Sequence, residues 1–321
     1  MFRTSLHFIV LAASLVCSSA MAQPVTAAAA PVLATASSFK TSDGVMLAHT
    51  VAGKGAPALF IHGGPGSGSE IVERLAGNTL EKHFRMVYLD QRGSGRSGSD
   101  PKKNYALDRV IQDMEELRES LKIKQWVLVS HSFGGIIATA YASKHPDRIS
   151  GMVMLNSILH LPASMESTAR YGYELLPVAT RPPMDPAMPL PQRFGMVMGM
   201  LGQANLTGKL MYADPGTEAR VNASLKGLPA NRDFASTLFT TGAIMDYVGD
   251  MAPATAALKM PVLVVSGKED HMVGVDHYKT FRFPNQTVAV VPGKHFAMIE
   301  QQAEVDKALG AYARSLPAMA D

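Results

Sequence analysis

Residues 126–137 of the chain read Trp-Val-Leu-Val-Ser-His-Ser-Phe-Gly-Gly-Ile-Ile. The first four residues are an apolar run typical of a buried strand, and a helix is expected from Gly134 to His145. A tight turn between such a strand and helix holds its central residue, Ser132, out above the edge of the sheet. Small residues two positions before and after it, Ser130 and Gly134, let strand and helix approach closely. We therefore predict that Ser132 is a nucleophile.

The rest of the chain alternates apolar runs with helical patterns. Nearly continuous apolar strands separated by amphipathic helices indicate a parallel sheet that is covered on both faces. A turn at 42–44 predicts an opening hairpin, which brings the expected total to a mostly parallel eight-stranded sheet. The other expected strands are 58–61, 84–89, 149–155, 261–265 and 287–291, and further helices are expected at 107–121 and from 297.

One long stretch, 157–250, interrupts this pattern with many Met, Pro and Gly residues and no clear strand. We predict a helical cap there, inserted between a first part of the core at 39–156 and a second part at 251–321. The methionines of this stretch fit ordinary packing best, then a flexible lid over an apolar pocket, and then a copper site. These methionines are Met184, Met188, Met196, Met198, Met200 and Met211.

The beginning of the chain has the features of an export signal. Arg3 precedes an apolar run that is shorter than a membrane span requires, and small residues lie at Ala20 and Ala22. We predict a signal peptide at 1–22, a flexible linker at 23–38, and a periplasmic or secreted protein without a stable membrane anchor. A lipid anchor at Cys17, the only cysteine, is disfavoured because bulky Val16 precedes it.

Composition limits the classes of function. With 47% hydrophobic and 18% charged residues among 321, the chain has enough apolar material for a large core. The formal net charge is only +3 and no stretch is strongly basic, which argues against nucleic acid as a partner. The expected partner is a small-molecule or short-peptide substrate.

Residues 62–66 read His-Gly-Gly-Pro-Gly directly after the expected strand that ends at Ile61. A glycine loop at this position can direct a backbone N–H toward a developing oxyanion. We predict that the N–H groups of Gly64 and Phe133 form the oxyanion hole, with Gly63 as the alternative to Gly64. His62 is expected to hold the loop in place.

A nucleophilic serine needs a base and an acid, which in this arrangement follow it in the order acid, then base. Asp270 comes just after the strand 261–265 and is the expected acid, with Glu269 as the alternative. His295 comes just after the strand 287–291 and before the last helix. It is the expected base, and His131 is not, because a side chain next to the nucleophile in such a turn points away.

Together these motifs resemble the prolyl-iminopeptidase-like branch of the α/β-hydrolase superfamily. The resemblance covers about 40–156 and 250–316, and the cap is not part of it. It is carried by His-Gly-Gly-Pro-Gly (62–66), Asp-Gln-Arg-Gly-Ser-Gly-Arg-Ser (90–97), the turn at 130–134, the loop 267–270, and Gly-Lys-His with Glu-Gln (293–301).

The resemblance implies the α/β-hydrolase fold and an aminopeptidase. No metal or other cofactor is expected, because the serine mechanism needs none and the sequence has neither a HExxH zinc motif nor a separate glycine-rich nucleotide motif. Iminopeptidases of this family bind the amine of the substrate through carboxylates of the cap. In this chain the candidates are Glu166, Glu174, Glu218 and Asp246. Two alternatives remain open: a carboxylesterase or lactonase that acts on small apolar esters, and a non-catalytic binding protein on a hydrolase scaffold.

Overall fold

The computed structural model describes residues 36–185, 187–228 and 231–317. All of them belong to one compact unit. The predicted signal peptide at 1–22 and residues 23–35 of the predicted linker lie outside the described residues. Within the described ranges, every helix is too short or too polar to cross a membrane.

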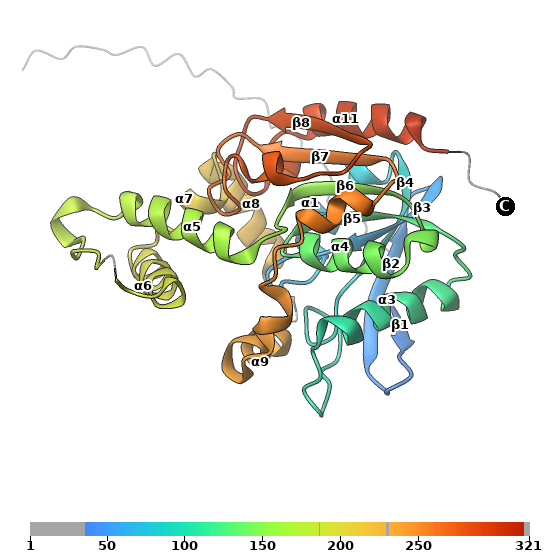
Figure 1. Ribbon diagram of the computed structural model, residues 1–321, viewed down its shortest axis with the longest axis horizontal. Helices are drawn as coiled ribbons and strands as arrows, with labels where there is room; N and C mark the ends of the chain where they lie inside the picture. The colour runs from blue at the N-terminus through green and yellow to red at the C-terminus, as the bar shows by residue number, and fades with distance from the viewer. Residues whose placement is uncertain (1–35, 186, 229–230, 318–321) are drawn as a thin grey trace, which may run out of the picture. The chain divides into compact units, whose positions relative to one another are not determined.

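The core is an eight-stranded sheet with the strand order β1-β2-β4-β3-β5-β6-β7-β8 (Figure 1). The β1–β2 and β2–β4 pairs are antiparallel, and every other neighbouring pair is parallel. This confirms the predicted mostly parallel sheet. The strands are β1 (Ser37–Lys40), β2 (Met46–Ala52), β3 (Ala56–Ile61), β4 (Phe84–Leu89), β5 (Trp126–Ser132), β6 (Ile149–Ser157), β7 (Val262–Gly267) and β8 (Gln286–Val291).

The first strand starts slightly before the sequence pattern indicates. Residues 37 and 38 were expected in the linker, yet Ser37 pairs with His49 and Ser38 pairs with Ala48. The two serines have little hydrophobic character, so periodicity does not reveal them as a strand. Their backbone groups nevertheless complete the edge of the opening hairpin.

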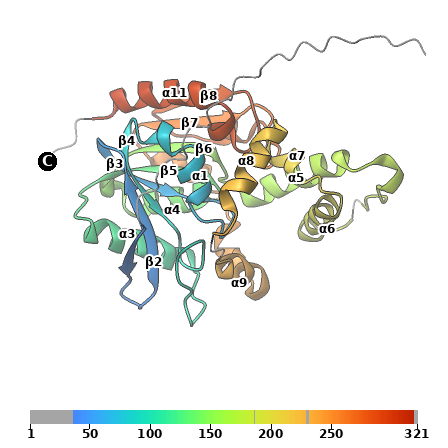
Figure 2. The same ribbon diagram turned by 180° about the vertical axis from the view of Figure 1, so that it is seen from behind.

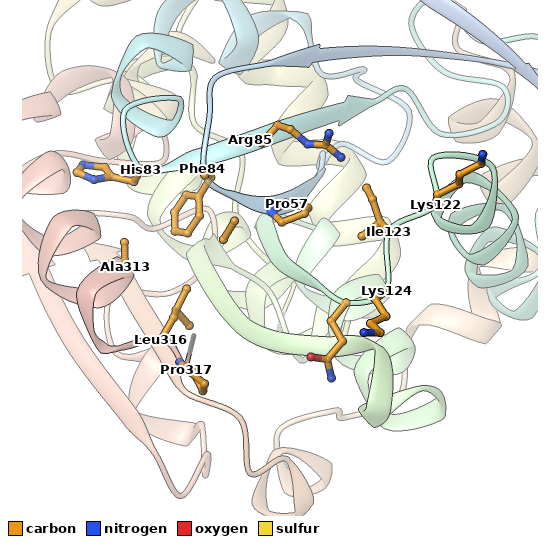
Figure 3. A pocket seen from close by; sticks show the side chains of 13 residues that line it. Pro57, His83, Phe84, Arg85, Lys122, Ile123, Lys124, Ala313, Leu316 and Pro317 are labelled. Atoms are coloured by element: carbon orange, nitrogen blue, oxygen red, sulfur yellow. The ribbon is translucent and has the colours of Figure 1, made fainter. Parts of the chain in front are cut away.

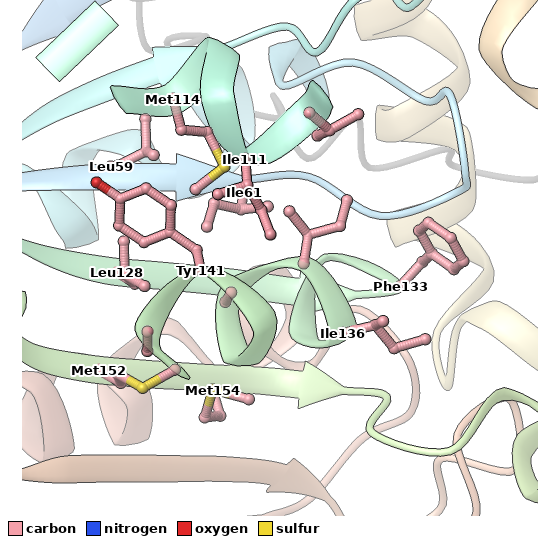
Figure 4. Packing of buried hydrophobic residues seen from close by; sticks show 14 of the residues in the cluster. Leu59, Ile61, Ile111, Met114, Leu128, Phe133, Ile136, Tyr141, Met152 and Met154 are labelled. Atoms are coloured by element: carbon pink, nitrogen blue, oxygen red, sulfur yellow. The ribbon is translucent and has the colours of Figure 1, made fainter. Parts of the chain in front are cut away.

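The central strands are apolar on both faces because helices cover both faces. In β3, Leu59 and Ile61 point to one side and Ala58 and Phe60 to the other, and all four are buried. The first side packs against α3 (Leu107–Ser120) and α4 (Gly134–Lys144), as Figure 4 shows. The second side packs against α1 (Glu70–Leu75), α2 (Gly77–Leu80), α10 (Ala297–Glu300) and α11 (Gln302–Ser315).

The stretch between β6 and β7 is helical, as the fold prediction requires of a cap. Figures 1 and 2 both show α5 and α6 lying side by side, away from the sheet. They share a small apolar cluster with Leu176, Val197, Leu201 and Leu210 at its centre. The helices of this stretch are α5 (Leu161–Leu175), α6 (Leu190–Gln203), α7 (Gly208–Met211), α8 (Pro215–Leu225) and α9 (Asp233–Thr241).

Most of the methionines singled out from the sequence pack in this small cluster. Met184, Met196, Met198, Met200 and Met211 contact its buried centre. Their arrangement therefore agrees with packing, the first of the three interpretations.

The described residues also form short 3-10 helices. These are η1 (Pro146–Arg148), η2 (Val178–Thr180), η3 (Ala243–Tyr247), η4 (Pro253–Ala257) and η5 (His277–Thr280).

Candidate active site

Ser132 lies at the turn from β5 into α4 with φ at +55°, in the left-handed region. The turn is tight enough that a side chain at Gly134 would collide with the carbonyl oxygen of Ile61. At the other small position, the Ser130 hydroxyl lies 2.9 Å from the hydroxyl of Ser157 on β6. A serine can replace the usual glycine there because its buried hydroxyl has a hydrogen-bond partner.

The structure brings Ser132, His295 and Asp270 together, although they are far apart in the sequence. Nε2 of His295 lies 3.0 Å from Oγ of Ser132. On the other side of the ring, Nδ1 lies 3.1 Å from Oδ2 and 3.2 Å from Oδ1 of Asp270. All three side chains are buried. They lie at the carboxyl ends of β5, β8 and β7 or in the loops that follow, where parallel strands end at one edge.

The surroundings of Asp270 favour its charged form. Burial by itself raises the pKa of this carboxyl group, but the His295 ring and hydrogen bonds from Asn156 and Val273 hold it below its usual value. Asn156 Nδ2 donates to Oδ2 at 2.6 Å, and the Val273 N–H donates to Oδ1 at 3.2 Å. A carboxylate that stays ionised can accept the Nδ1–H of His295 and leave Nε2 free to accept a proton.

The glycine loop lies directly against the nucleophile. A Cβ added to Gly63 would come within 2.6 Å of the Ser132 Cβ, so only a glycine allows this approach. Within the described ranges, the N–H groups of Gly64 and Phe133 make no hydrogen bond to a protein acceptor. The Phe133 side chain packs against Tyr247, with 5.1 Å between ring centroids, and against Phe234 of α9 at 6.5 Å.

The fold that holds these residues is shared with other proteins. A family model described as the alpha/beta hydrolase fold matches residues 57–302. The chain belongs to this family. The match confirms the predicted fold.

Relatives with similar sequences agree with the predicted branch. A proline iminopeptidase from Arabidopsis thaliana is 38% identical over 120 residues, which are 36% of this chain and 31% of the relative. One from Neisseria gonorrhoeae is 37% identical over 111 residues, 34% of this chain and 35% of the relative. The chain thus spans about a third of the length of the curated relatives it matches.

The fold extends further than these sequence matches. A proline iminopeptidase-related protein from Thermus thermophilus superposes with a TM-score of 0.72 at 23% identity. The superposition covers 88% of this chain and 100% of the other. At 23% identity, this similarity shows a shared fold and nothing about function.

In this α/β hydrolase the motif at 90–97 serves as a scaffold for the glycine loop. The Gln91 N–H donates to Nε2 of His62 at 3.0 Å, and the Gln91 side chain donates to the His62 carbonyl oxygen at 2.9 Å. Asp90 accepts the N–H of Ser69 at 2.8 Å. Arg92 is fully buried and pairs with Asp113 at 2.6 Å. The contacts of Asp90 and Gln91 tie the end of β4 to the loop that follows β3, and Arg92 ties it to α3.

Gly134 gives a direct test of the packing at the turn. Gly134→Ala is expected to destabilise the hydrolase by about 3 kcal/mol, because the new Cβ meets the backbone at Ile61 and at His62. The matched control is Gly195→Ala in α6, where an added Cβ has nothing within 4 Å. Alanine is the better helix former there, so stability is expected to rise by up to about 1 kcal/mol. Denaturant unfolding measures both; equal stability of the two variants would contradict the packing described at the turn.

A buried group of charges lies beneath the glycine loop. Arg96 pairs with Asp90 at 2.8 Å, with Glu73 at 3.1 Å and with Glu70 at 3.4 Å. Three carboxylates thus share one guanidinium. Burial and the charge of Asp90 raise the pKa of Glu70 to about 7, against an ordinary value of 4.5. Glu70 therefore holds its proton more tightly in the folded protein than in the unfolded chain.

The raised pKa of Glu70 predicts how stability depends on pH. Since the folded state binds this proton more tightly, the contribution of Glu70 is present below pH 4.5 and is lost as pH rises through about 7. Glu70→Gln is expected to reduce the fall in Tm between pH 5 and pH 8 and to be the more stable form at pH 8. Asp276→Asn, at an exposed carboxylate, is the control and keeps the wild-type slope. An unchanged slope in Glu70→Gln would rule out this titration.

A cavity of about 90 Å³ lies next to Ser132. Apart from the catalytic groups and the glycine loop, its wall is largely apolar, and Met211 and Met272 belong to it. Among the described residues that line it, none is a carboxylate, and the predicted cap carboxylates are not among them. Glu166 pairs with Arg193 of α6, and the Glu218 carboxylate lies against Gly208 at the start of α7. Glu174, at the end of α5, and Asp246, in η3, are exposed.

A larger cavity, of about 680 Å³, lies at the opposite end of the central strands (Figure 3). Pro57 at the start of β3 and Phe84 at the start of β4 line it, together with Leu316. The described residues of its wall do not include Ser132, Asp270 or His295. The larger cavity is therefore separate from the candidate active site, which lies at the carboxyl ends of the strands.

Three further residues contact the catalytic loops, and the sequence patterns assigned them no role. His131 Nε2 lies 3.0 Å from the carbonyl oxygen of His295 and donates to it, because a carbonyl oxygen only accepts. Burial lowers the pKa of His131 to about 3 and keeps the ring neutral. Asn156 contacts Asp270. Glu300 accepts the Lys294 N–H at 3.1 Å and the N–H of Ala213, in the cap, at 2.6 Å. Two of them carry a signal in the sequence: Asn156 is polar and ends an apolar run, and Glu300 belongs to the motif at 293–301.

Proposed function

We propose that this protein is a serine hydrolase that cleaves a small ester or amide through an acyl-enzyme. The observation that carries the proposal is the continuous hydrogen-bonded series from Ser132 Oγ through His295 to Asp270, with distances of 3.0 and 3.1 Å. Hydrogen bonding to a histidine activates a weakly nucleophilic hydroxyl, and the acid holds the imidazole in the required tautomer.

The proposed reaction needs only these groups and water. Nε2 of His295 accepts the hydroxyl proton while Ser132 Oγ bonds to the carbonyl carbon of the substrate. The N–H groups of Gly64 and Phe133 donate to the resulting oxyanion, each contributing about 3 kcal/mol to transition-state stabilisation. His295 then gives the proton to the leaving amine or alcohol as its bond to carbon breaks. Water, deprotonated by the same nitrogen, attacks the acyl-enzyme and releases Ser132.

For the substrate, the first candidate is a short peptide with proline or another small residue at its amino end. The support is the similarity to two proline iminopeptidases, which are 38% and 37% identical over 120 and 111 residues. The second candidate is a small apolar ester. It is favoured by one specific observation, the cavity beside Ser132, whose wall contains Met211 and Met272 but no carboxylate to bind an ammonium group.

Two measurements test these proposals. A fluorophosphonate should add one covalent group to the protein, and mass spectrometry should locate it on the peptide that contains Ser132. Proline β-naphthylamide and short p-nitrophenyl esters, compared at equal concentration, separate the substrates. Turnover of the esters alone would exclude the aminopeptidase. A folded protein that neither reacts with the probe nor turns over either substrate would instead be a binding protein on a hydrolase scaffold.

A further inference from the structure

Asn156 joins the loop of the acid to the loop of the base. It lies at the carboxyl end of β6, beside β7, and its side chain is buried. Its Nδ2 donates to Oδ2 of Asp270 at 2.6 Å and to the carbonyl oxygen of Lys294 at 3.1 Å. Lys294 directly precedes His295. One amide group therefore contacts both segments whose relative position sets the distance between His295 and Asp270.

The chemistry of the two partners fixes the orientation of this amide. A carboxylate and a carbonyl oxygen both only accept, so the NH2 group must face them. The Oδ1 atom of Asn156 is then left buried, with no hydrogen-bond partner in the part of the chain that the structure describes. An unpaired buried carbonyl destabilises a fold. Fold stability alone therefore does not account for an asparagine at this position, whereas alignment of the catalytic loops does.

The backbone around Asn156 is adapted to this contact. Asn156 has φ at +45°, in the left-handed region that asparagine tolerates better than most residues. Gly267, at the end of β7, leaves room for the amide. A Cβ there would lie 3.0 Å from Asn156 Nδ2 and 2.9 Å from the carbonyl oxygen of Gly293. Through both features, the end of β6 contacts the loop that carries Asp270 and the loop that carries His295 at one point.

We propose that Asn156 is a positioning residue for the catalytic groups. Its amide holds the carboxylate of Asp270 in the position from which it accepts a hydrogen bond from Nδ1 of His295. The proposal rests on the proposed function of the triad. The titratable groups that face Asp270 are His131, His271, His277 and His295. None of them is changed in the variants that test it.

Three variants separate positioning from fold stability. Asn156→Leu keeps the approximate shape but removes both donated hydrogen bonds. Asn156→Asp places a second carboxylate against Asp270. Val153→Ala, in the buried middle of the same strand, lowers stability without touching either loop. For each variant, Tm, kcat, KM and the pH profile of kcat/KM are measured with the best substrate of the panel, after fluorophosphonate titration of the active wild type.

Asn156→Leu is expected to lose up to about 100-fold in kcat with KM nearly unchanged, because a misaligned base affects the transition state rather than binding. Asn156→Asp is expected to move the acid limb of the profile upward by about one pH unit, since added negative charge favours the protonated imidazole. Val153→Ala should lower Tm and leave kcat and the profile as in wild type.

Two results would overturn the positioning role. One is an Asn156→Leu variant that keeps wild-type kcat together with an unmoved acid limb in Asn156→Asp. The other is a loss of activity that merely follows Tm and appears equally in Val153→Ala. Absence of probe labelling in the folded wild type is a different failure, because it removes the proposed serine mechanism and with it the role of Asn156.

Discussion

Ser132→Ala is expected to lower kcat by about 10⁶-fold, because it removes the atom that forms the acyl-enzyme. The residual rate comes from the oxyanion hole and from substrate binding alone. Tm should stay close to that of wild type, since the hydroxyl contacts only the Nε2 of His295 among the described residues. Steady-state kinetics and fluorophosphonate labelling measure the effect.

The control for this variant lies two residues earlier. Ser130 has the same side chain, but its hydroxyl is fully buried and lies 2.9 Å from the hydroxyl of Ser157. Ser130→Ala should therefore react with the probe and keep its turnover within a small factor. If Ser132→Ala kept substantial turnover, or if Ser130→Ala lost it instead, Ser132 would not be the nucleophile.

Asp270→Asn carries the second-largest expected effect, a fall of about 10⁴-fold in kcat at neutral pH. The amide keeps the size of the side chain, but it no longer fixes the Nδ1–H tautomer or stabilises the imidazolium. KM should change little. The measurement is kcat and KM across the pH range in which the variant stays folded.

Glu269 provides the matched control, since it is the neighbouring carboxylate and the alternative acid in the sequence. Its side chain is exposed, whereas Asp270 is buried and lies 3.1 Å from His295 Nδ1. Glu269→Gln is expected to have wild-type kinetics. Equal losses in the two variants would mean that the negative charge of the loop matters, rather than the contact between Asp270 and His295.

The sequence was sufficient to predict most of the core, because each central strand is apolar on both faces. The order of the strands could not be predicted from the sequence. β4 lies between β2 and β3, and this follows from pairings such as Val51 with Val87 and Leu59 with Val87, which no local pattern records. The first strand was placed two residues late for a similar reason: Ser37 and Ser38 are held by backbone pairing alone.

Within the site, residues at strand ends were predictable and residues that act across strands were not. Ser132, Asp270 and His295 each follow an apolar run, and the structure brings them within hydrogen-bonding distance. Asn156 also follows such a run, but its contact with Asp270 depends on β6 and β7 being neighbours.

The cap was the hardest part to interpret. Its carboxylates were selected by charge and by the family resemblance, with no spacing to distinguish among them. The structure places Glu166 in an ion pair with Arg193 and Glu218 beside Gly208, while Glu174 and Asp246 are exposed. A side chain in a helical insertion is positioned by how the helices pack on one another, and that packing depends on contacts such as those of Val197 and Leu201.

The double contact of Glu300 has a consequence for engineering this enzyme. One carboxylate holds the backbone beside the base, and its other oxygen holds the start of the connection from α7 to α8. A chimaera that received the insertion of a relative would lose the second anchor unless the incoming segment also presented an N–H where Ala213 presents one. To transfer the substrate specificity of a relative into this protein, residue 300 of this protein and the incoming α7–α8 connection would therefore have to be chosen together.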